Sequence, residues 1–503
     1  MTYLLETYGC QMNKAESAAL EIIFRERGWS KAPEGALACS SLRELPNNRE
    51  SGSDDSRGGA QKSASLDADV DLVVINTCSV RATAENRAWG RIDLFAAAKR
   101  ERAAACIAVR AAHGPASGTQ AKPLVLVVTG CMAERLKEDI KRRQPAVDYV
   151  VGTFQKQAFG LLLDAVEQGK RVDDIDESPV FAFAPSYYDG GSFRSFVPIM
   201  HGCDNFCAYC IVPHIRGREI SRSPSSILAE LAALEDSGVR EVTLLGQNVN
   251  SYRWRGEADR LRGSAIDEEP LDFPGLLRLV SAALRARGSG GLRWIRFLTS
   301  HPKDLSDEVI RVLAEDPLYC KHVHLCVQSG SDAVLEAMNR RYTRDSYLEL
   351  VGRMKSAVPG LSLSSDILVG FPGETEADLE LTLDLMSRVG YTYSYMYHFN
   401  PREGTPAWTM PGRIQDDVKR ERLARVIGLQ KAMTKSLMES RVGAVEDVLI
   451  ESISRRKKSE VLARTQRDEM VVFPAPPSRV GSFAKVRLLS LSGNTFKAEE
   501  LVS

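Results

Sequence analysis

The stretch GCDNFCAYC at residues 202–210 decides how the rest of the sequence is interpreted. It puts Cys203, Cys207 and Cys210 on one short loop, directly after an apolar segment of strand length. Three thiolates at this spacing can hold three irons of a cubane cluster, which leaves the fourth iron without a protein ligand. A structural zinc site is the alternative, but such sites normally use four protein ligands, and no partnering cysteine pair lies nearby.

The vacant iron position predicts a type of chemistry. A molecule with an amine and a carboxylate could chelate that iron and place a sulfonium beside an electron donor. Transfer of one electron would then break a carbon–sulfur bond and release an alkyl radical. The three cysteines are therefore predicted to be both metal ligands and catalytic residues, with the difficult chemistry carried by the cofactor.

Six strand-like segments surround this loop and alternate with helix-like segments. A helix is expected from Ser223, with Pro224 at its first position and Gly238 as its stop, and another from Ser306. Six β/α units predict an open, partial barrel rather than the eight-unit closed one, with function at the carboxyl ends of the strands. The predicted strands are FVPIM (196–200), EVTLLGQ (241–247), WIRFLTS (294–300), HVHLCVQ (322–328), LSLSSDILVG (361–370) and YTYSYMYHF (391–399).

The N-terminal third repeats one pattern three times. Short apolar runs at residues 3–8, 72–76 and 124–129 are each followed by a cysteine and a helix-like segment. Strands that alternate with helices predict a parallel sheet, in which the carboxyl ends of neighbouring strands meet at one edge. The three cysteines, Cys10, Cys78 and Cys131, are therefore expected to lie close together.

The C-terminal residues have a different pattern. EDVLIES, EVLART, EMVVFP and FAKVRLLS are β-rich segments separated by Pro and Gly turns, which predicts a small antiparallel β-barrel, an architecture often used to hold nucleic acid. We therefore expect an α/β protein with an N-terminal domain at 1–175, a core at 189–436 and a barrel at 439–503. Residues 30–69 and 106–122 are predicted to be flexible insertions, because apolar side chains are too few to repay ordering.

Composition excludes several classes of protein. The 503 residues contain 66 Lys plus Arg and 66 Asp plus Glu, so RNA contact would have to come from local patches rather than from net charge. No apolar run reaches the roughly 20 residues of a membrane span, and no signal peptide is evident. We expect a cytoplasmic protein without membrane contact, whose ten cysteines are free or bound to metal.

Polar and glycine-rich positions after the predicted strands are candidates to bind a cofactor. Tyr209 could pack on a nucleoside, although an aromatic side chain there could also only fill space. The others follow the second and fifth strands of the core, where asparagines often form turns and where glycines let the backbone approach a ligand. They are Gly246, Gln247, Asn248, Asn250, Asp366, Gly370, Pro372 and Gly373.

Three basic clusters are candidates for RNA contact. A run of charges is usually a solvated face, so each cluster alone is a weak signal. The case for RNA contact is stronger for the C-terminal cluster, because it lies in the predicted barrel. The clusters are Arg216, Arg218 and Arg222; Arg340, Arg341 and Arg344; and Arg455, Arg456, Lys457 and Lys458.

The ordered motifs together resemble the methylthiotransferase family of the radical S-adenosylmethionine (SAM) superfamily. They are TYGCQMN (7–13), INTCSVR (75–81), TGCMAER (129–135), GCDNFCAYCIVPHIRGREISR (202–222), LLGQNVNSY (244–252), QSGSD (328–332), MNRRYTR (338–344), GFPGETEAD (370–378) and REGTPAW (402–408). The last segment resembles a TRAM domain. Within the family, the motifs are most similar to the branch that modifies N6-isopentenyladenosine in tRNA. The resemblance covers nearly the whole chain except the insertions.

This resemblance implies two [4Fe-4S] clusters, the second held by Cys10, Cys78 and Cys131. It implies a 5′-deoxyadenosyl radical that abstracts hydrogen from C2 of adenine, sulfur presented by the second cluster, and two SAM molecules per turnover. The product would be 2-methylthio-N6-isopentenyladenosine at position 37 of tRNA. The implied partners are a tRNA anticodon stem-loop gripped by the TRAM barrel, a reducing electron-donor protein and a sulfur donor.

Three alternatives remain open at this stage. The family's other branches methylthiolate threonylcarbamoyladenosine in tRNA or an aspartate of a ribosomal protein. In a different class, the chain could be a non-catalytic iron–sulfur sensor that binds RNA. The sequence also departs from the family, because Cys326 stands where many members have proline. For Cys326, with Cys320 nearby, the alternatives are a redox role and a buried small side chain, of which we expect the second; we assign no role to Cys39 and Cys106.

Overall fold

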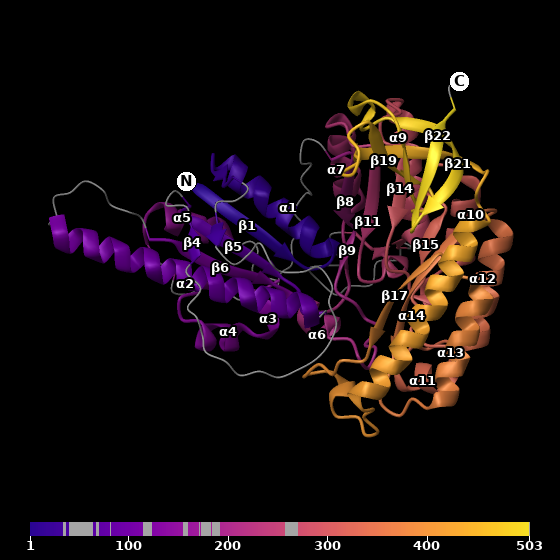
Figure 1. Cartoon of the computed structure of the whole chain (residues 1–503), viewed down its shortest axis with the longest axis horizontal. Helices are drawn as coiled ribbons and strands as arrows, with labels where there is room; N and C mark the ends of the chain where they lie inside the picture. The colour runs from indigo at the N-terminus through magenta and orange to yellow at the C-terminus, as the bar shows by residue number, and fades with distance from the viewer. Residues whose placement is uncertain are drawn as a thin grey trace. The chain divides into compact units, whose positions relative to one another are not determined.

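The computed structural model divides the chain into two compact units, residues 1–184 and 185–503 (Figure 1). It describes residues 1–33, 37–39, 64–66, 70–80, 82–113, 123–153, 159–170, 172, 183, 192–256 and 270–501. Among these residues, no helix combines the length and the apolar character needed to cross a bilayer.

The first unit contains a parallel sheet of strand order β2-β1-β5-β6-β7. Alternate residues of its central strand β5 face opposite layers. Val73 and Ile75 pack in one apolar cluster with helix α2, and Leu72 and Val74 pack in another with α1 and α5. The elements are β1 Thr2–Tyr8, α1 Gln11–Glu26, β2 Ser30–Lys31, β5 Leu72–Thr77, α2 Ala82–His113, β6 Val125–Gly130, α3 Cys131–Arg135, α4 Lys137–Arg143, β7 Tyr149–Val151 and α5 Phe159–Glu167.

The two predicted insertions contain more regular structure than expected. Within 30–69, β2 joins the parallel sheet, and β3 (Leu37–Cys39) pairs antiparallel with β4 (Ala64–Leu66). Helix α2 continues to His113, so the expectation of a flexible segment from residue 106 was wrong for its first eight residues. The Ala-rich sequence of that part favours helix. The rest of both predicted insertions lies outside the described residues.

The second unit begins with the partial barrel, whose six predicted strands are confirmed. The strands form two parallel three-stranded sheets, β14-β11-β8 and β15-β16-β17, which the parallel bridges Ile295–Tyr319 and Ser300–Leu325 connect. A helix follows each strand, as a (β/α)6 barrel requires. The elements are β8 Arg194–Pro198, α7 Pro224–Asp236, β11 Glu241–Leu245, α9 Phe273–Arg287, β14 Trp294–Phe297, α10 Asp307–Glu315, β15 His322–His324, α12 Arg344–Ala357, β16 Ser362–Val369, α13 Glu376–Val389, β17 Tyr393–His398 and α14 Asp416–Glu439.

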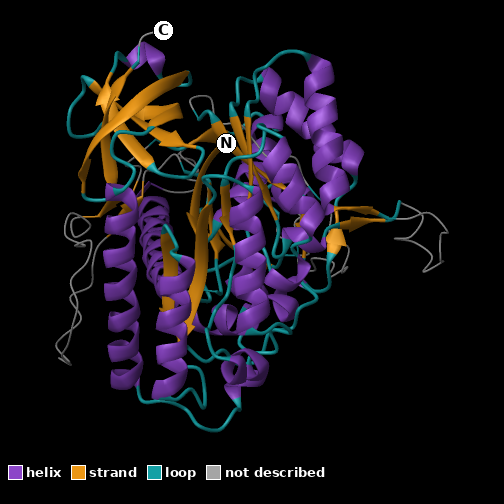
Figure 2. Ribbon diagram, turned by 90° about the vertical axis from the view of Figure 1, so that its right-hand side faces the viewer, coloured by secondary structure: helices purple, strands orange, loops and turns teal. Residues whose placement is uncertain are grey.

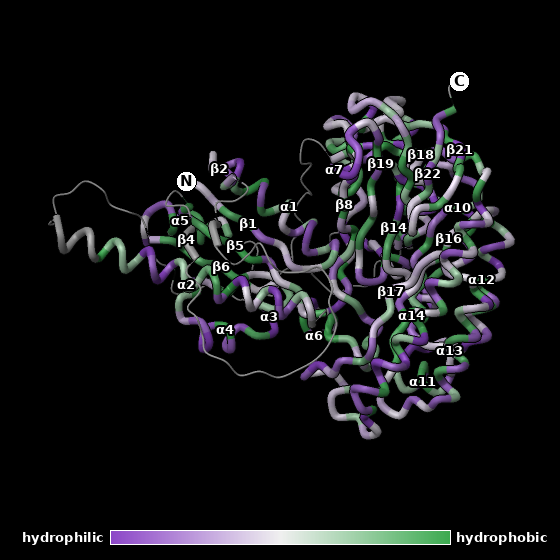
Figure 3. Tube along the Cα trace, in the orientation of Figure 1, coloured by the Kyte–Doolittle hydropathy of each residue, from purple (hydrophilic) through white to green (hydrophobic). Residues whose placement is uncertain are grey.

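Helix ends in the barrel follow the expected capping chemistry. The side chain of Ser223 accepts a hydrogen bond from the Ser226 amide at 3.3 Å, and Ser306 accepts one from Val309 at 3.4 Å. Helices α12, α13 and α14 alternate between hydrophobic and hydrophilic residues, as expected of amphipathic helices that cover strands (Figure 3). The smaller elements are β9 Met200–His201, α6 Val212–Arg216, β10 Ile220–Ser221, η3 Val249–Ser251, β12 Arg253–Trp254, β13 Leu271–Asp272, η4 Pro302–Asp304, α11 Asp332–Ala337 and η5 Pro406–Trp408.

The C-terminal segment is a closed five-stranded barrel, shown as orange strands beside the long helices of the core (Figure 2). Four of its pairings are antiparallel and the fifth, β20 with β22, is parallel. The four predicted strands are present, and β22, which was not predicted, closes the barrel. The elements are β18 Val445–Ile453, β19 Glu460–Thr465, β20 Met470–Pro474, η6 Pro477–Arg479, β21 Phe483–Ser492 and β22 Thr495–Glu500.

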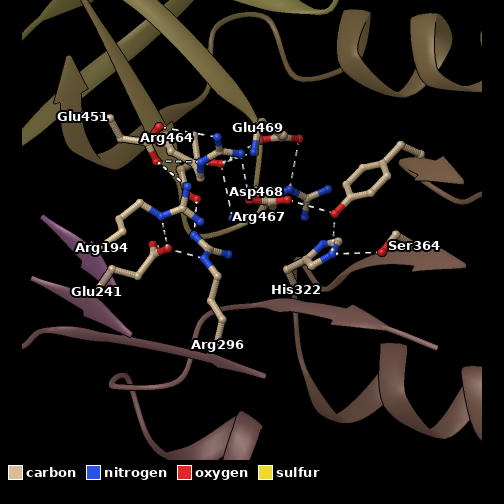
Figure 4. Close-up of polar contacts among 12 residues, drawn as sticks. Arg194, Glu241, Arg296, His322, Ser364, Glu451, Arg464, Arg467, Asp468 and Glu469 are labelled. Atoms are coloured by element: carbon tan, nitrogen blue, oxygen red, sulfur yellow. Dashed lines mark hydrogen bonds and ion pairs between the residues drawn. The ribbon is translucent and has the colours of Figure 1, made fainter. Parts of the chain in front are cut away.

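The C-terminal barrel docks on the core through a polar network (Figure 4). Arg296, only 4% exposed, donates to the main-chain oxygens of Thr465 and Gln466, at 2.7 Å each, and forms an ion pair with Glu241. The Tyr393 hydroxyl donates to Asp468 at 2.8 Å. These contacts fix the β19–β20 turn against the amino-terminal ends of the core strands.

Candidate functional site

The cysteine loop follows β9, and its conformation depends on tight backbone packing. Cys203 and Cys207 are buried, and Cys210 is half-buried. Gly202 has φ +77°, and a Cβ there would lie 2.0 Å from the Arg218 carbonyl oxygen, so only glycine fits. The Cys203 amide donates a hydrogen bond to the main-chain oxygen of Gly217 at 3.2 Å, which fixes the start of the loop.

A second segment, residues 338–340, holds the loop from the other side. The Ala208 amide donates to the Met338 oxygen at 3.0 Å, and the Asn339 side chain donates to the Phe206 oxygen at 3.0 Å. Arg340 places its Nη1 3.3 Å from the Cys207 sulfur. The MNRRYTR motif therefore positions the cysteine loop.

The burial of Arg340 corrects one sequence-based expectation. Its side chain is 4% exposed and also donates to the Cys326 main-chain oxygen at 2.6 Å and lies 3.4 Å from the Tyr209 hydroxyl. A guanidinium in this position does not face RNA. Tyr209 packs against an apolar cluster that includes Phe371 and Phe399, which fits a space-filling role as well as contact with a ligand.

The geometry of the three thiols disagrees with a single zinc ion. Two sulfurs on one zinc can be at most about 4.6 Å apart, since Zn–S bonds are about 2.3 Å. Among the described residues, the one group of three such donors within 4.8 Å of each other is elsewhere, so Cys203, Cys207 and Cys210 do not converge that closely. A cluster with several irons accommodates wider spacing. Burial raises the pKa of Cys203 to about 11 and that of Cys210 to about 12, so metal binding here would release protons.

Buried polar atoms without partners mark the carboxyl ends of β11 and β14. Asn250 has neither its Nδ2 nor its Oδ1 hydrogen-bonded, and Gln247 Oε1, Ser300 Oγ and His301 Nε2 are also buried without partners. Such atoms are rare in folded proteins unless a ligand or water completes them. Burial lowers the pKa of His301 to about 2, so its ring is neutral. These atoms could complete their hydrogen bonds on a polar ligand.

Asn248 and Gly246 do not leave buried polar side-chain atoms without hydrogen-bond partners. The Asn248 side chain donates to Asp304 at 2.7 Å and accepts from the His301 amide at 3.2 Å, so it organises the loop after β14. A Cβ at Gly246 would lie 2.4 Å from the Met200 side chain, which explains the glycine by packing. Both residues therefore have structural roles beside Gln247 and Asn250.

The bend at residues 370–374 is held by helix α14. The Gly370 amide donates to both oxygens of Glu374, at 2.9 and 3.0 Å, and Glu374 pairs with Arg422 at 2.8 Å. Gly373 donates to the Gly412 oxygen at 2.9 Å, and Pro372 lies buried between them. The amide N–H groups of Gly370 and Gly373 are thus used within the protein, so they are not free to donate to a ligand, and contact of this backbone with a cofactor stays a prediction. The sequence interpretation missed Glu374, which organises the bend.

Asp366 lies on β16 beside two residues of the neighbouring strand segment. Its Oδ2 is 3.6 Å from His324 Nε2 and 3.4 Å from the Cys326 sulfur. Burial would raise the pKa of Asp366, but His324, Cys326 and Arg340 together outweigh burial, so the net pKa is lowered. Cys326 is buried, as expected, but it belongs to a polar group, whereas Cys320 packs with Trp294 in an apolar cluster.

The first unit brings its three cysteines to one edge of its sheet. In the parallel register, Tyr8 lies opposite Thr77, and Thr77 lies opposite Gly130. Cys10, Cys78 and Cys131 follow these three strand ends and come at or just before helices α1, α2 and α3. The side chain of Cys10 hydrogen-bonds to Cys78 and, with burial and the nearby Cys131, raises the pKa of Cys78.

An asparagine pair pins these strand ends together. Asn13 donates to the Asn76 side chain at 3.0 Å and to the Thr77 oxygen at 3.1 Å, and both asparagines are almost fully buried. Asn13 Oδ1 lies 3.3 Å from the Cys10 sulfur. The motifs TYGCQMN and INTC contain both asparagines, which is the signal that could have identified this pair.

The basic clusters divide by burial. Arg216 and Arg222 are buried, and Arg222 pairs with Glu230, so neither offers a surface charge. Arg344 binds the Gly330 and Leu381 oxygens and pairs with Asp384, which gives it a structural role. For these three arginines, the structure argues against RNA contact. The exposed residues of the three basic clusters are Arg218, Arg341, Arg455, Arg456, Lys457 and Lys458, the last four on the β18–β19 hairpin.

Comparisons with known proteins identify the family. The chain is 43% identical over 511 residues to tRNA-2-methylthio-N(6)-dimethylallyladenosine synthase of Treponema denticola, a match that covers 99% of each chain. It is 38% identical to the Bacteroides thetaiotaomicron protein of that name (99% and 95% covered) and 39% identical to the Geobacter metallireducens one (96% and 95%). The chain belongs to the tRNA-2-methylthio-N6-dimethylallyladenosine synthase family.

Domain and structure matches agree with this assignment. Residues 197–386 match the radical SAM superfamily, 56–152 match the description "Uncharacterized protein family UPF0004", and 439–499 match the TRAM domain. The solved structure of the radical SAM methyltransferase TsrM from Kitasatospora setae has a TM-score of 0.50 at 15% identity (81% of this chain and 77% of that one), which shows a shared fold. Membership of the synthase family and the superfamily implies a [4Fe-4S] cluster and SAM.

Proposed function

We propose that this radical SAM enzyme adds a methylthio group to C2 of N6-isopentenyladenosine at position 37 of tRNA, in the cytoplasm. The observation that carries the proposal is the pair of cysteine trios, one on the core loop and one at the sheet edge of the first unit. Near-complete alignment with synthases of this name supports the choice of substrate over threonylcarbamoyladenosine or a ribosomal aspartate.

Each trio would hold one [4Fe-4S] cluster. Cys203, Cys207 and Cys210 would ligate the cluster that supplies the electron for SAM cleavage, and the other trio would ligate the auxiliary cluster at which sulfur is added. Arg340 would orient Cys207 through its contact with the sulfur. Asn250 and Gln247 would complete their hydrogen bonds on SAM, and His301 would offer a neutral ring nitrogen.

The TRAM barrel would bind the anticodon stem-loop. The β18–β19 hairpin carries four exposed basic residues at the end of β19 opposite the β19–β20 turn, which is docked on the core. Phosphate contacts by this hairpin would position the RNA, while an unpaired base enters the core barrel. A reducing protein and a sulfur donor would complete the cycle, which uses two SAM molecules.

Three variants test this division of labour in anaerobically reconstituted enzyme. Cys207→Ala should abolish 5′-deoxyadenosine formation, whereas Cys78→Ala should permit SAM cleavage and stop methylthiolation of tRNA. Cys106→Ala, a half-buried cysteine of α2 outside both trios, should leave both reactions unchanged. The readouts are 5′-deoxyadenosine and the nucleoside masses of digested tRNA. Equal behaviour of the first two variants would refute the two roles, and no SAM cleavage by the unaltered enzyme would favour an RNA-binding sensor.

A further inference from the structure

The pattern His-x-Cys at the end of β15 puts two potential metal ligands on one face of the sheet. Side chains two residues apart on a strand point the same way, so His324 and Cys326 share a face. β16 pairs in parallel with His324 opposite Ser364, and Asp366 lies two residues further along. The three potential ligands His324, Cys326 and Asp366 therefore converge from two neighbouring strands.

The two separations that involve Asp366 match those of ligands on one metal ion. With metal–N, metal–O and metal–S bonds of about 2.05, 2.1 and 2.3 Å, a tetrahedral ion keeps its ligand atoms about 3.4–3.6 Å apart. Asp366 Oδ2 lies 3.6 Å from His324 Nε2 and 3.4 Å from Cys326 Sγ. All three ligand atoms lie within 4.8 Å of one another, which distinguishes this group from both cysteine trios.

The histidine is already oriented as in known metal sites. A metal-bound histidine usually hydrogen-bonds through its other ring nitrogen, which fixes the ring. His324 Nδ1 lies 2.9 Å from the Ser364 hydroxyl, which leaves Nε2 directed at Asp366. His324 is 7% and Cys326 6% exposed, so solvent competes weakly. Arg340 contacts the main-chain oxygen of Cys326, while the Cys326 thiol donates to Asp366, so a bound cation would replace that proton.

We propose that His324, Cys326 and Asp366 form a binding site for a thiophilic divalent cation such as Zn²⁺ inside the core barrel, separate from both iron–sulfur clusters. A mixed N, S, O donor set suits zinc, and a thiolate with a carboxylate neutralises its charge. Three protein ligands leave one coordination position open. The competing explanation is that the group is only a hydrogen-bonded cluster.

Zinc K-edge X-ray absorption on the cluster-loaded enzyme tests the site, because iron does not contribute at that edge. After equilibrium dialysis against Zn²⁺, we expect one zinc per chain with one sulfur at about 2.3 Å and N/O ligands at about 2.0–2.2 Å. Cys326→Ala should lose the sulfur signal and weaken binding by more than about 100-fold. Ser364→Ala, which removes the partner of His324, should weaken it by about 10–100-fold. Cys320→Ala is the matched control, since it removes a nearby buried thiol that packs with Trp294.

Each remaining outcome overturns the proposal. Zinc uptake that is unchanged in Cys326→Ala, or a zinc with three sulfur ligands, would place the metal in a cysteine trio. No uptake by the unaltered enzyme would leave a hydrogen-bonded cluster. Cys326→Ser preserves the size of the side chain and should lose zinc binding as Cys326→Ala does. Thermal unfolding of both variants shows whether they are folded, which separates loss of a ligand from a folding defect.

Discussion

Replacing Arg296 by methionine should weaken the docking of the TRAM barrel on the core by about 2–4 kcal/mol. The variant removes the donor to the partly buried Gln466 oxygen, and a carbonyl left without a donor costs about 1–3 kcal/mol where water cannot replace that donor. Thr465 keeps the Asp468 amide as a donor, and Glu241 keeps its ion pair with Arg194, so their losses are partial. The methionine preserves most of the packing volume.

Hydrogen exchange followed by mass spectrometry measures this effect locally. A loss of about 2–4 kcal/mol corresponds to roughly 30-fold to 1,000-fold less protection, which we expect in the β19–β20 turn at residues 465–469. Arg278→Met is the control, because Arg278 forms an exposed ion pair with Glu308 on the surface of the core and should change protection little. Unchanged protection of the turn in Arg296→Met would refute the assignment of Arg296 as the docking residue.

Three further predictions concern SAM, RNA and pH. Asn250→Ala should raise the Kd for SAM by roughly 5–30-fold in calorimetry without lowering the melting temperature of the free enzyme, because both polar atoms lack partners there; a lower melting temperature would indicate a structural role. Replacing Lys457 and Lys458 by alanine should flatten the salt dependence of tRNA binding by about 0.7 log units per lost phosphate contact; an unchanged slope would place RNA contact elsewhere. Burial raises the pKa of Asp468, but His322, Arg296 and Arg464 outweigh burial and lower that pKa. The ionised Asp468 therefore stabilises the folded protein fully above about pH 4, and this stabilisation is lost as the pH falls. Asp468→Asn should therefore melt earlier than wild type at pH 6, and the difference in melting temperature should shrink progressively as the pH falls below about 4; a constant difference would contradict this.

The strands and the cysteine positions could be predicted because local patterns encode them. Apolar runs of strand length, separated by capped helices such as the one from Ser223, give the six units of the core. The β22 sequence TFKAEE was missed, since half of its residues are charged and its pairing with β20 and β21 is non-local. The helical end of α2 was missed because the Gly- and Ser-rich residues after it dominated the interpretation.

The roles of the charged residues could not be predicted, because burial depends on partners far along the chain. Arg340 is read as a surface residue in its own motif, yet its partner Cys207 lies 133 residues away. Glu374 pairs with Arg422, 48 residues away, across the bend and helix α14. Asn248 was predicted to face a cofactor from its position after a strand, but Asp304 and His301 use its side chain. Motif spacing identifies the site, whereas tertiary contacts assign the roles within it.

The most direct test of two clusters per chain is iron and sulfide analysis of the enzyme isolated without oxygen. Two cubanes correspond to about eight irons and eight sulfides per chain, and Cys78→Ala should retain about half of each. A colourless protein that holds only zinc, or an unaltered enzyme that binds no more than four irons after reconstitution, would contradict the proposed pair of cysteine trios.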